Sequence, residues 1–145
     1  MSIIVTSYIN IMSSTNTNRY HYGVGRRKAS AARAKFYPVE AEITITINGK
    51  EAKTYLPEFY LNTLNNFFTN IGINKGQFAI FVNGGGVNGQ TDAIRLAIAK
   101  ALVKSDETMK PTLRQLGYLT TDIRQVLPKR PGLRKARKRE QWSKR

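Results

Sequence analysis

The sequence contains no cysteine, one histidine and one tryptophan among its 145 residues. The absence of cysteine excludes disulfides, zinc ribbons and thiol catalysis, and it fits a reducing compartment. No apolar run approaches the roughly 18 residues of a membrane span, so a soluble protein is expected. Met1 to Asn18 contains neither Lys nor Arg. This segment therefore lacks the charged start of a secretory signal and the Arg-rich face of a transit peptide.

Acidic residues are also few: nine Asp and Glu stand against 24 Lys and Arg, and the net charge is +15. The excess is concentrated in two segments. Arg19 to Lys35 has six basic residues and no acid, and Pro128 to Arg145 has nine basic residues and one acid. The segment between them, Phe36 to Leu127, is nearly neutral, with nine basic and eight acidic residues. Such a large excess of basic over acidic residues favours polyanionic partners.

Nucleic acid explains the basic tail better than the alternatives do. A solvated charged face is the usual explanation of one short run, but two segments carry nearly all of the excess here. A membrane surface requires an amphipathic helix with large apolar residues opposite the charges. The tail offers only Leu133, Ala136 and Trp142, and Pro128 and Pro131 oppose a long helix. It buries too little apolar surface to fold alone, so we expect it to become ordered along RNA.

Alternating patterns predict strands. Ala29 to Phe36 alternates small or apolar residues with Arg and Lys, and Ile43 to Ile47 alternates Ile with Thr. Both patterns are typical of half-buried strands. Asn48-Gly49 is a hairpin turn signal after the second strand. Phe78 to Val82 is apolar throughout, which predicts a strand buried on both faces.

Helical spacing predicts three further elements. Pro57 opens a helix that runs through Phe68, and Gly72 and Gly76 end it. Ile94 to Leu102 has the clearest amphipathic spacing, and a short helix is expected over Pro111 to Leu116. The order β–β–α–β–α predicts an α+β fold with helices on one face of a small sheet. We expect a flexible extension over residues 1–18, a globular RNA-binding domain over 19–127 and an extended basic tail over 128–145.

The glycine-rich loop from Gly84 to Gly89 lies between a predicted strand and a predicted helix. Loops of this kind resemble phosphate sites, because backbone N–H groups and the helix dipole can hold a phosphate at the start of a helix. It matches neither a Walker loop nor a dinucleotide fingerprint with its acidic partner. We expect close approach of the backbone to an RNA phosphate at Gly84, Gly85 and Gly86. A tight turn that needs positive φ is the structural alternative.

Catalysis has little support. The sole histidine, His21, lies between two tyrosines without a nearby carboxylate in the sequence, and the acids are scattered without metal-ligand spacing. Asp92, near a helix start, is most simply a partner of the helix dipole. We therefore expect no enzyme activity, no cofactor and no metal site.

Five segments in chain order resemble the small-subunit ribosomal protein S-nine family, in its bacterial and organellar form. They are Gly23 to Arg33 (GVGRRKASAAR), Ile43 to Lys50 (ITITINGK), Gly84 to Leu102 (GGGVNGQ, then AIRLAIAKAL from Ala93), Leu116 to Asp122 (LGYLTTD), and Pro131 to Arg145 (PGLRKARK, ending QWSKR).

The resemblance implies a ribosomal S5 domain-two-like sandwich and a structural place in the head of the small ribosomal subunit. Neighbouring ribosomal proteins of the head and ribosomal RNA would be partners. The residues expected to bind ribosomal RNA are Arg26, Arg27, Lys28, Arg33, Arg134, Lys135, Arg137, Lys138 and Arg139. The tail would end at the anticodon stem-loop of the tRNA in the peptidyl site, which Ser143, Lys144 and Arg145 would contact.

Two alternatives remain beside this interpretation. One is a free-standing RNA-binding regulator or chaperone with the same charge, and the other is an enzyme that uses the loop from Gly84 to Gly89. The lack of a transit peptide favours a cytoplasmic bacterial ribosome, or a plastid or mitochondrial ribosome whose organelle encodes the protein.

Overall fold

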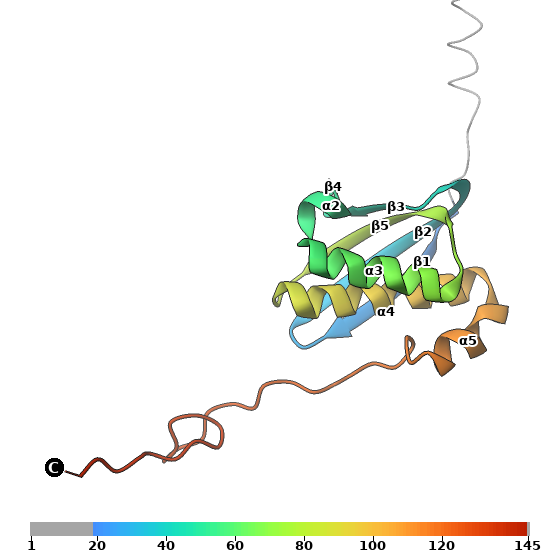
Figure 1. Cartoon of the computed structure of the whole chain (residues 1–145). Helices are drawn as coiled ribbons and strands as arrows, with labels where there is room; N and C mark the ends of the chain where they lie inside the picture. The colour runs from blue at the N-terminus through green and yellow to red at the C-terminus, as the bar shows by residue number, and fades with distance from the viewer. Residues whose placement is uncertain (1–18, 145) are drawn as a thin grey trace, which may run out of the picture.

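A mixed five-stranded sheet forms the body of the protein, seen here in a computed structural model that describes residues 19–144 (Figure 1). Its strand order is β1-β2-β5-β3-β4. Neighbouring strands pair antiparallel except β3 and β5, which are parallel. The strands are β1 (His21–Arg27), β2 (Ser30–Glu42), β3 (Thr44–Ile47), β4 (Lys50–Glu51) and β5 (Lys75–Asn83). The predicted extension over residues 1–18 lies outside the described residues.

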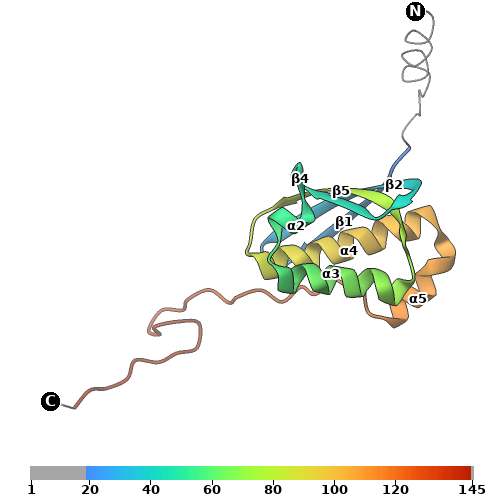
Figure 2. The ribbon, with the colours of Figure 1, turned by 45° about the horizontal axis from the view of Figure 1, so that its top comes forward.

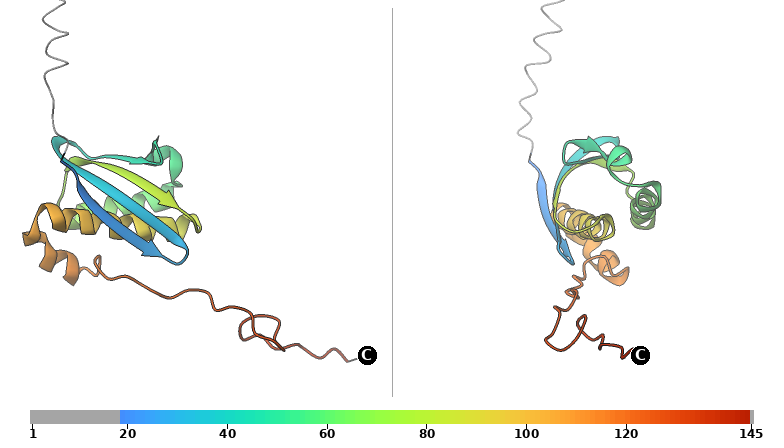
Figure 3. Two further views of the ribbon diagram at one scale, coloured as in Figure 1. Left: turned by 180° about the vertical axis from the view of Figure 1, so that it is seen from behind. Right: turned by 90° about the vertical axis from the view of Figure 1, so that its left-hand side faces the viewer.

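Two long helices cover one face of this sheet, and no helix of residues 19–144 covers the other, open face (Figures 1 and 3). The mixed sheet and its one-sided helical layer confirm the predicted α+β class. None of the helices in residues 19–144 has the length and apolar character needed to cross a membrane. The helical elements are α2 (Ala52–Tyr55), α3 (Glu58–Ile71), α4 (Val87–Ser105), the short 3-10 helix η1 (Glu107–Met109) and α5 (Lys110–Gln115).

Strand β2 has the predicted alternation. Ala32, Ala34 and Phe36 are buried beneath the helices, whereas Arg33 and Lys35 are exposed on the open face. The prediction that β5 is buried on both faces is wrong. Phe78, Ile80 and Val82 are buried, but Phe81 is 57% exposed. The reason is that the described helices cover only one face of the sheet, so Ala79 and Phe81 face away from the core and the larger side chain remains exposed.

Strand β1 was missing from the predicted order because glycine replaces apolar residues on its buried face. Gly23 and Gly25 face α4 so closely that an added Cβ would lie 2.0 Å from the carbonyl oxygens of Ala97 and Ala93, respectively. Without side chains, the strand backbone packs directly on the helix. The second missing strand, β4, is only two residues long and closes the hairpin that begins at β3.

The helices follow the predicted spacing with local corrections. In α4 the predicted apolar stripe from Ile94 to Leu102 is buried. Helix α3 begins after Pro57 and ends at Gly72, which has a left-handed φ of 76°. Phe59, in the first turn of α3, is 75% exposed and lies outside the core. Gly76, expected to help end this helix, lies within β5.

Candidate nucleic-acid interface

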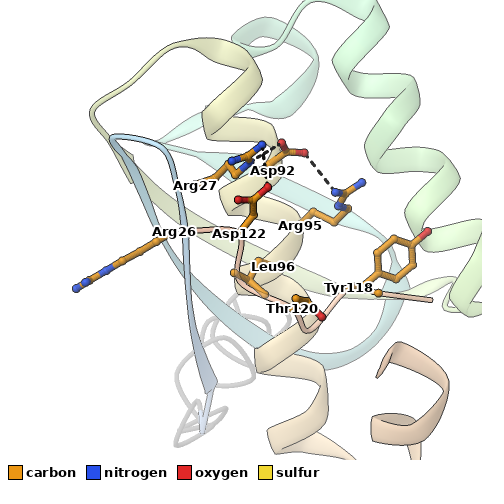
Figure 4. A pocket seen from close by; sticks show the side chains of 9 residues that line it. Arg26, Arg27, Asp92, Arg95, Leu96, Tyr118, Thr120 and Asp122 are labelled. Carbon is orange, nitrogen blue, oxygen red and sulfur yellow. Dashed lines mark hydrogen bonds and ion pairs between the residues drawn. The ribbon is translucent and has the colours of Figure 1, made fainter. Parts of the chain in front are cut away.

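The hairpin between β1 and β2 presents cations of the first basic segment to solvent. Arg26 and Arg33 are exposed on the two strands, and Lys28 is exposed in the turn with a left-handed φ of 54°. Figure 4 shows the Arg26 side chain extending away from the neighbouring charged cluster. The side chains of these three predicted RNA-binding residues are therefore accessible to solvent.

Arg27 differs from its neighbours because its guanidinium pairs with carboxylates of the protein itself (Figure 4). Its Nε lies 3.5 Å from Oδ2 of Asp92 in α4, and its Nη2 lies 3.2 Å from Oδ2 of Asp122. Its Nη1 donates to the carbonyl oxygen of Arg124 at 3.4 Å. The side chain is only 21% exposed. Arg27 thus joins the first strand, the long helix and the segment that follows α5.

Asp122 is the centre of this cluster. Arg124 donates to it from Nη2 at 2.7 Å and from Nε at 3.1 Å, and the Arg124 backbone N–H donates at 2.9 Å. These hydrogen bonds hold the pKa of the Asp122 carboxyl well below its usual range, and they raise the pKa of Arg124. Asp122 therefore stays ionised at neutral pH, as an anion among arginines.

Asp92 was expected to act on the helix dipole, but it lies in the second turn of α4 and pairs with two arginines. Besides Arg27, it contacts Nη2 of Arg95 at 3.3 Å. The Arg95 guanidinium lies 5.4 Å from the ring centre of Tyr118. Tyr118 in turn packs edge-on against Phe67 at 4.8 Å. Charge and aromatic packing together hold residues 118–124 on the body.

A hollow of about 300 Å³ lies within this cluster. The sequence did not predict the cluster, because Asp92 and Asp122 are far apart in the chain. The local signal was an arginine two or three residues after each of these carboxylates. The residues that line the hollow are Arg26, Arg27, Asp92, Arg95, Leu96, Gly117, Tyr118, Thr120 and Asp122.

The glycine loop is shaped mainly by internal packing. Gly84 and Gly85 have left-handed φ values of 73° and 64°. An added Cβ at Gly85 would lie 2.0 Å from Oγ of Ser30. Gly86 has no such neighbour, and it precedes the first turn of α4, where no side chain caps the helix. The helix begins at Val87, so the second half of the predicted loop is helical.

The basic tail leaves the body without a helix or strand in the described residues after α5 (Figures 1 and 2). Gly132 has a left-handed φ of 75°, as expected for a break in regular structure. The tail is not fully extended, because the Arg134 N–H donates to the carbonyl oxygen of Lys138 at 2.8 Å and closes a small loop.

Within residues 128–144, the predicted RNA-binding cations are all exposed, and none of them forms an ion pair with a described residue. These cations are Arg134, Lys135, Arg137, Lys138, Arg139 and Lys144, and the neutral Ser143, predicted to contact tRNA, is exposed as well. Arg145 lies outside the described residues. The domain boundary predicted after residue 127 stays a prediction. Just before it, Gln125 contacts the body, since its Nε2 donates to the carbonyl oxygen of Lys28 at 3.3 Å.

The described residues contain no group of three His, Asp or Glu side chains arranged to hold a metal ion. A sequence model of the family described as ribosomal protein S9/S16 matches residues 25–145. The match begins within β1 and covers the turn to β2, the glycine loop, α4, the charged cluster and the tail.

Proposed function

Since the chain belongs to the ribosomal protein S9/S16 family, we propose that its body and tail are anchored in ribosomal RNA while its C-terminal end contacts peptidyl-site tRNA. Membership makes the chain a structural, non-enzymatic constituent of the small ribosomal subunit that functions in translation and binds ribosomal RNA. Ribosomal RNA and other ribosomal proteins are therefore its partners. The enzyme alternative for the glycine loop is wrong for a member of this family.

The observation that supports the tail contact is the contrast between the two ends of the C-terminal segment. Its base is held on the body by Arg27 and Asp122. Its cations beyond residue 128 are exposed and have no acidic partner among the described residues. Residues 126–144 span about 65 Å when extended, at roughly 3.3–3.6 Å per residue. A held base and a long cationic end suit a segment that follows RNA away from the body.

Within this proposal the predicted residues have distinct roles. Arg26, Lys28 and Arg33 contact ribosomal RNA phosphates from the body, and the cluster from Arg134 to Arg139 contacts them along the tail. Arg27, predicted in the same group, positions the base of the tail through its two carboxylate partners. Gly86 and the open first turn of α4 accept an RNA phosphate, since Gly84 and Gly85 already serve the turn.

Removal of Ser143, Lys144 and Arg145 tests the tail contact. Small subunits reconstituted with the truncated protein are expected to assemble normally, because the other basic tail residues remain. They should release tRNA from the peptidyl site faster than subunits with the full chain. A matched control replaces Lys135, Arg137 and Lys138 with Gln, which should weaken incorporation into the subunit. An unchanged rate of tRNA dissociation from the truncated subunits would contradict the proposed contact.

A further inference from the structure

The open face of the sheet carries exposed aromatic and cationic side chains next to one another. In the strand register, the half-buried Tyr22 pairs with the exposed Lys35, and the exposed Arg33 pairs with the exposed Phe81. These side chains alternate with the buried residues of their strands, so they point away from the helices. Figure 3 (left) shows the strands from this side, with no helix crossing β1, β2 or β5.

A hollow of about 540 Å³ lies on this face around the small side chain of Ala79. Ala79 pairs with Lys35 on one side and with Thr46 on the other. Phe81 follows two residues along β5, on the same face. The volume falls within the roughly 300–1,000 Å³ of ligand sites. The hollow is lined by Tyr22, Arg33, Lys35, Thr46, Asn48, Gly49, Ala79, Ile80 and Phe81.

The chemistry of the lining points to a polyanion with flat apolar faces. Two of the lining residues, Arg33 and Lys35, are exposed cations, and none is Asp or Glu. Phe81 leaves 57% of its surface in water, although a ring of this size gains free energy when it is covered. Cations already lie over rings nearby, since Nζ of Lys35 is 4.8 Å from the ring centre of Tyr20.

We propose that this hollow receives an unpaired base of ribosomal RNA, which stacks on Phe81 while adjacent phosphates pair with Arg33 and Lys35. The inference rests on the proposed RNA contact of Arg33 and does not depend on the tail. Aromatic platforms beside cations bind single-stranded RNA because every base has a π face and every nucleotide a phosphate. Bases inside an A-form duplex are stacked on one another, so an unpaired nucleotide is the form that fits.

The first test compares Phe81→Leu with Phe81→Trp in the full chain, with a short single-stranded RNA and an RNA duplex of equal length as probes. Phe81→Leu should weaken single-strand binding roughly 5- to 150-fold, which corresponds to the loss of one stacked base. Phe81→Trp should restore it, and duplex binding should change little. Phe59→Leu is the matched control, because Phe59 is also exposed but lies on α3.

The salt dependence of RNA binding separates the contribution of charge from the contribution of stacking. Phe81→Leu should leave the slope of log affinity against log salt unchanged, whereas Arg33→Gln should reduce it by about 0.7 for a single strand. Equal affinity of Phe81→Leu and the unchanged protein for single-stranded RNA would overturn the proposal. So would an equal loss in Phe59→Leu.

The second test identifies the occupant in the assembled particle. A photoreactive phenylalanine analogue at position 81 should form an adduct with ribosomal RNA in purified small subunits. An adduct with a neighbouring ribosomal protein instead would overturn the proposal. Failure of the base-stacking proposal can be distinguished from failure of the tail contact. Phe81→Leu should leave tRNA release from the peptidyl site unchanged. Removal of residues 143–145 should change tRNA release and leave single-stranded RNA binding at Phe81 unchanged.

Discussion

Arg27 in β1 and Asp122 beyond α5 form an ion pair in which Nη2 and Oδ2 are 3.2 Å apart. The contact joins the first strand of the body to the segment from which the basic tail departs. Asp92 in α4 contacts the same guanidinium at 3.5 Å. The direction in which the tail leaves the body therefore depends on an arginine that lies within a motif otherwise suited to RNA.

Replacement of Arg27 by Gln should lower the free energy of unfolding by about 1–2 kcal/mol, since two partly buried carboxylates lose a charged donor. Amide hydrogen exchange should also become faster in residues 118–125. Urea unfolding and exchange mass spectrometry measure the two effects. The control Arg26→Gln removes an exposed arginine and should change stability by less than about 0.5 kcal/mol. Equal effects of the two variants would contradict the role given to Arg27.

Stability should depend on the ionisation of Asp122. Hydrogen bonds from Arg124 lower the pKa of this carboxyl in the folded protein, so the unfolded chain binds the proton more tightly. The resulting stabilisation is complete above the ordinary carboxyl pKa of about 3.9 and is lost as the pH falls below it. The unfolding midpoints of the unchanged protein and Asp122→Asn should thus differ by a constant amount between about pH 7 and pH 5, and converge toward pH 2. A constant difference over the whole range would refute this assignment.

Gly25→Ala should destabilise the body by about 3 kcal/mol or prevent folding, because the new methyl group would lie 2.0 Å from the Ala93 carbonyl oxygen. Gly86→Ala is the matched control. Gly86 has no atom within 4 Å of an added Cβ and an ordinary φ of −102°. Its replacement should cost less than about 1 kcal/mol. Thermal unfolding of both variants measures the difference, and similar midpoints would show that β1 and α4 pack less tightly than described.

The side chain of Asn48 extends the hydrogen bonding between β3 and β5 beyond the end of β3. Its Nδ2 donates to the Val82 carbonyl oxygen at 3.0 Å, and its Oδ1 accepts from the Val82 N–H at 2.8 Å. Asn48→Gly loses both hydrogen bonds but tolerates the left-handed φ of 50°, so a loss of about 1–2 kcal/mol is expected. Asn48→Ala should lose about 1 kcal/mol more through backbone strain. Equal unfolding free energies for the two variants would exclude a strain contribution.

Replacement of Arg26 and Lys28 by Gln should impair incorporation into the small subunit without affecting stability, since both side chains are exposed. Each lost phosphate contact should reduce the salt slope of RNA binding by roughly 0.7–0.9. Quantitative mass spectrometry of reconstituted subunits measures incorporation. As a matched control, Lys50→Gln and Lys53→Gln remove two exposed lysines near the opposite edge of the sheet. Normal incorporation of the Arg26 and Lys28 variant would mean that the hairpin is not an RNA anchor.

Much of the fold follows from the sequence by itself. The two basic segments, the alternation of β2 and the apolar stripe of α4 are local patterns, because their periods match the geometry of a strand or a helix. The turn at Asn48-Gly49 is equally local, since both residues have the positive φ that favours Asn and Gly there. Net charge also identified the class of partner, because it acts over distance whatever the fold.

Tertiary structure decided what depends on neighbours far apart in the chain. Gly23 and Gly25 give no apolar signal, yet their missing side chains let β1 lie directly on α4. Phe81 belongs to an apolar run, but none of the described helices packs on its side of the sheet, and the ring is exposed beside Arg33. Arg27 resembles its basic neighbours until the fold brings Asp122 to it. Sequence patterns encode local periodicity and total charge, whereas burial and ion pairing depend on which surfaces meet.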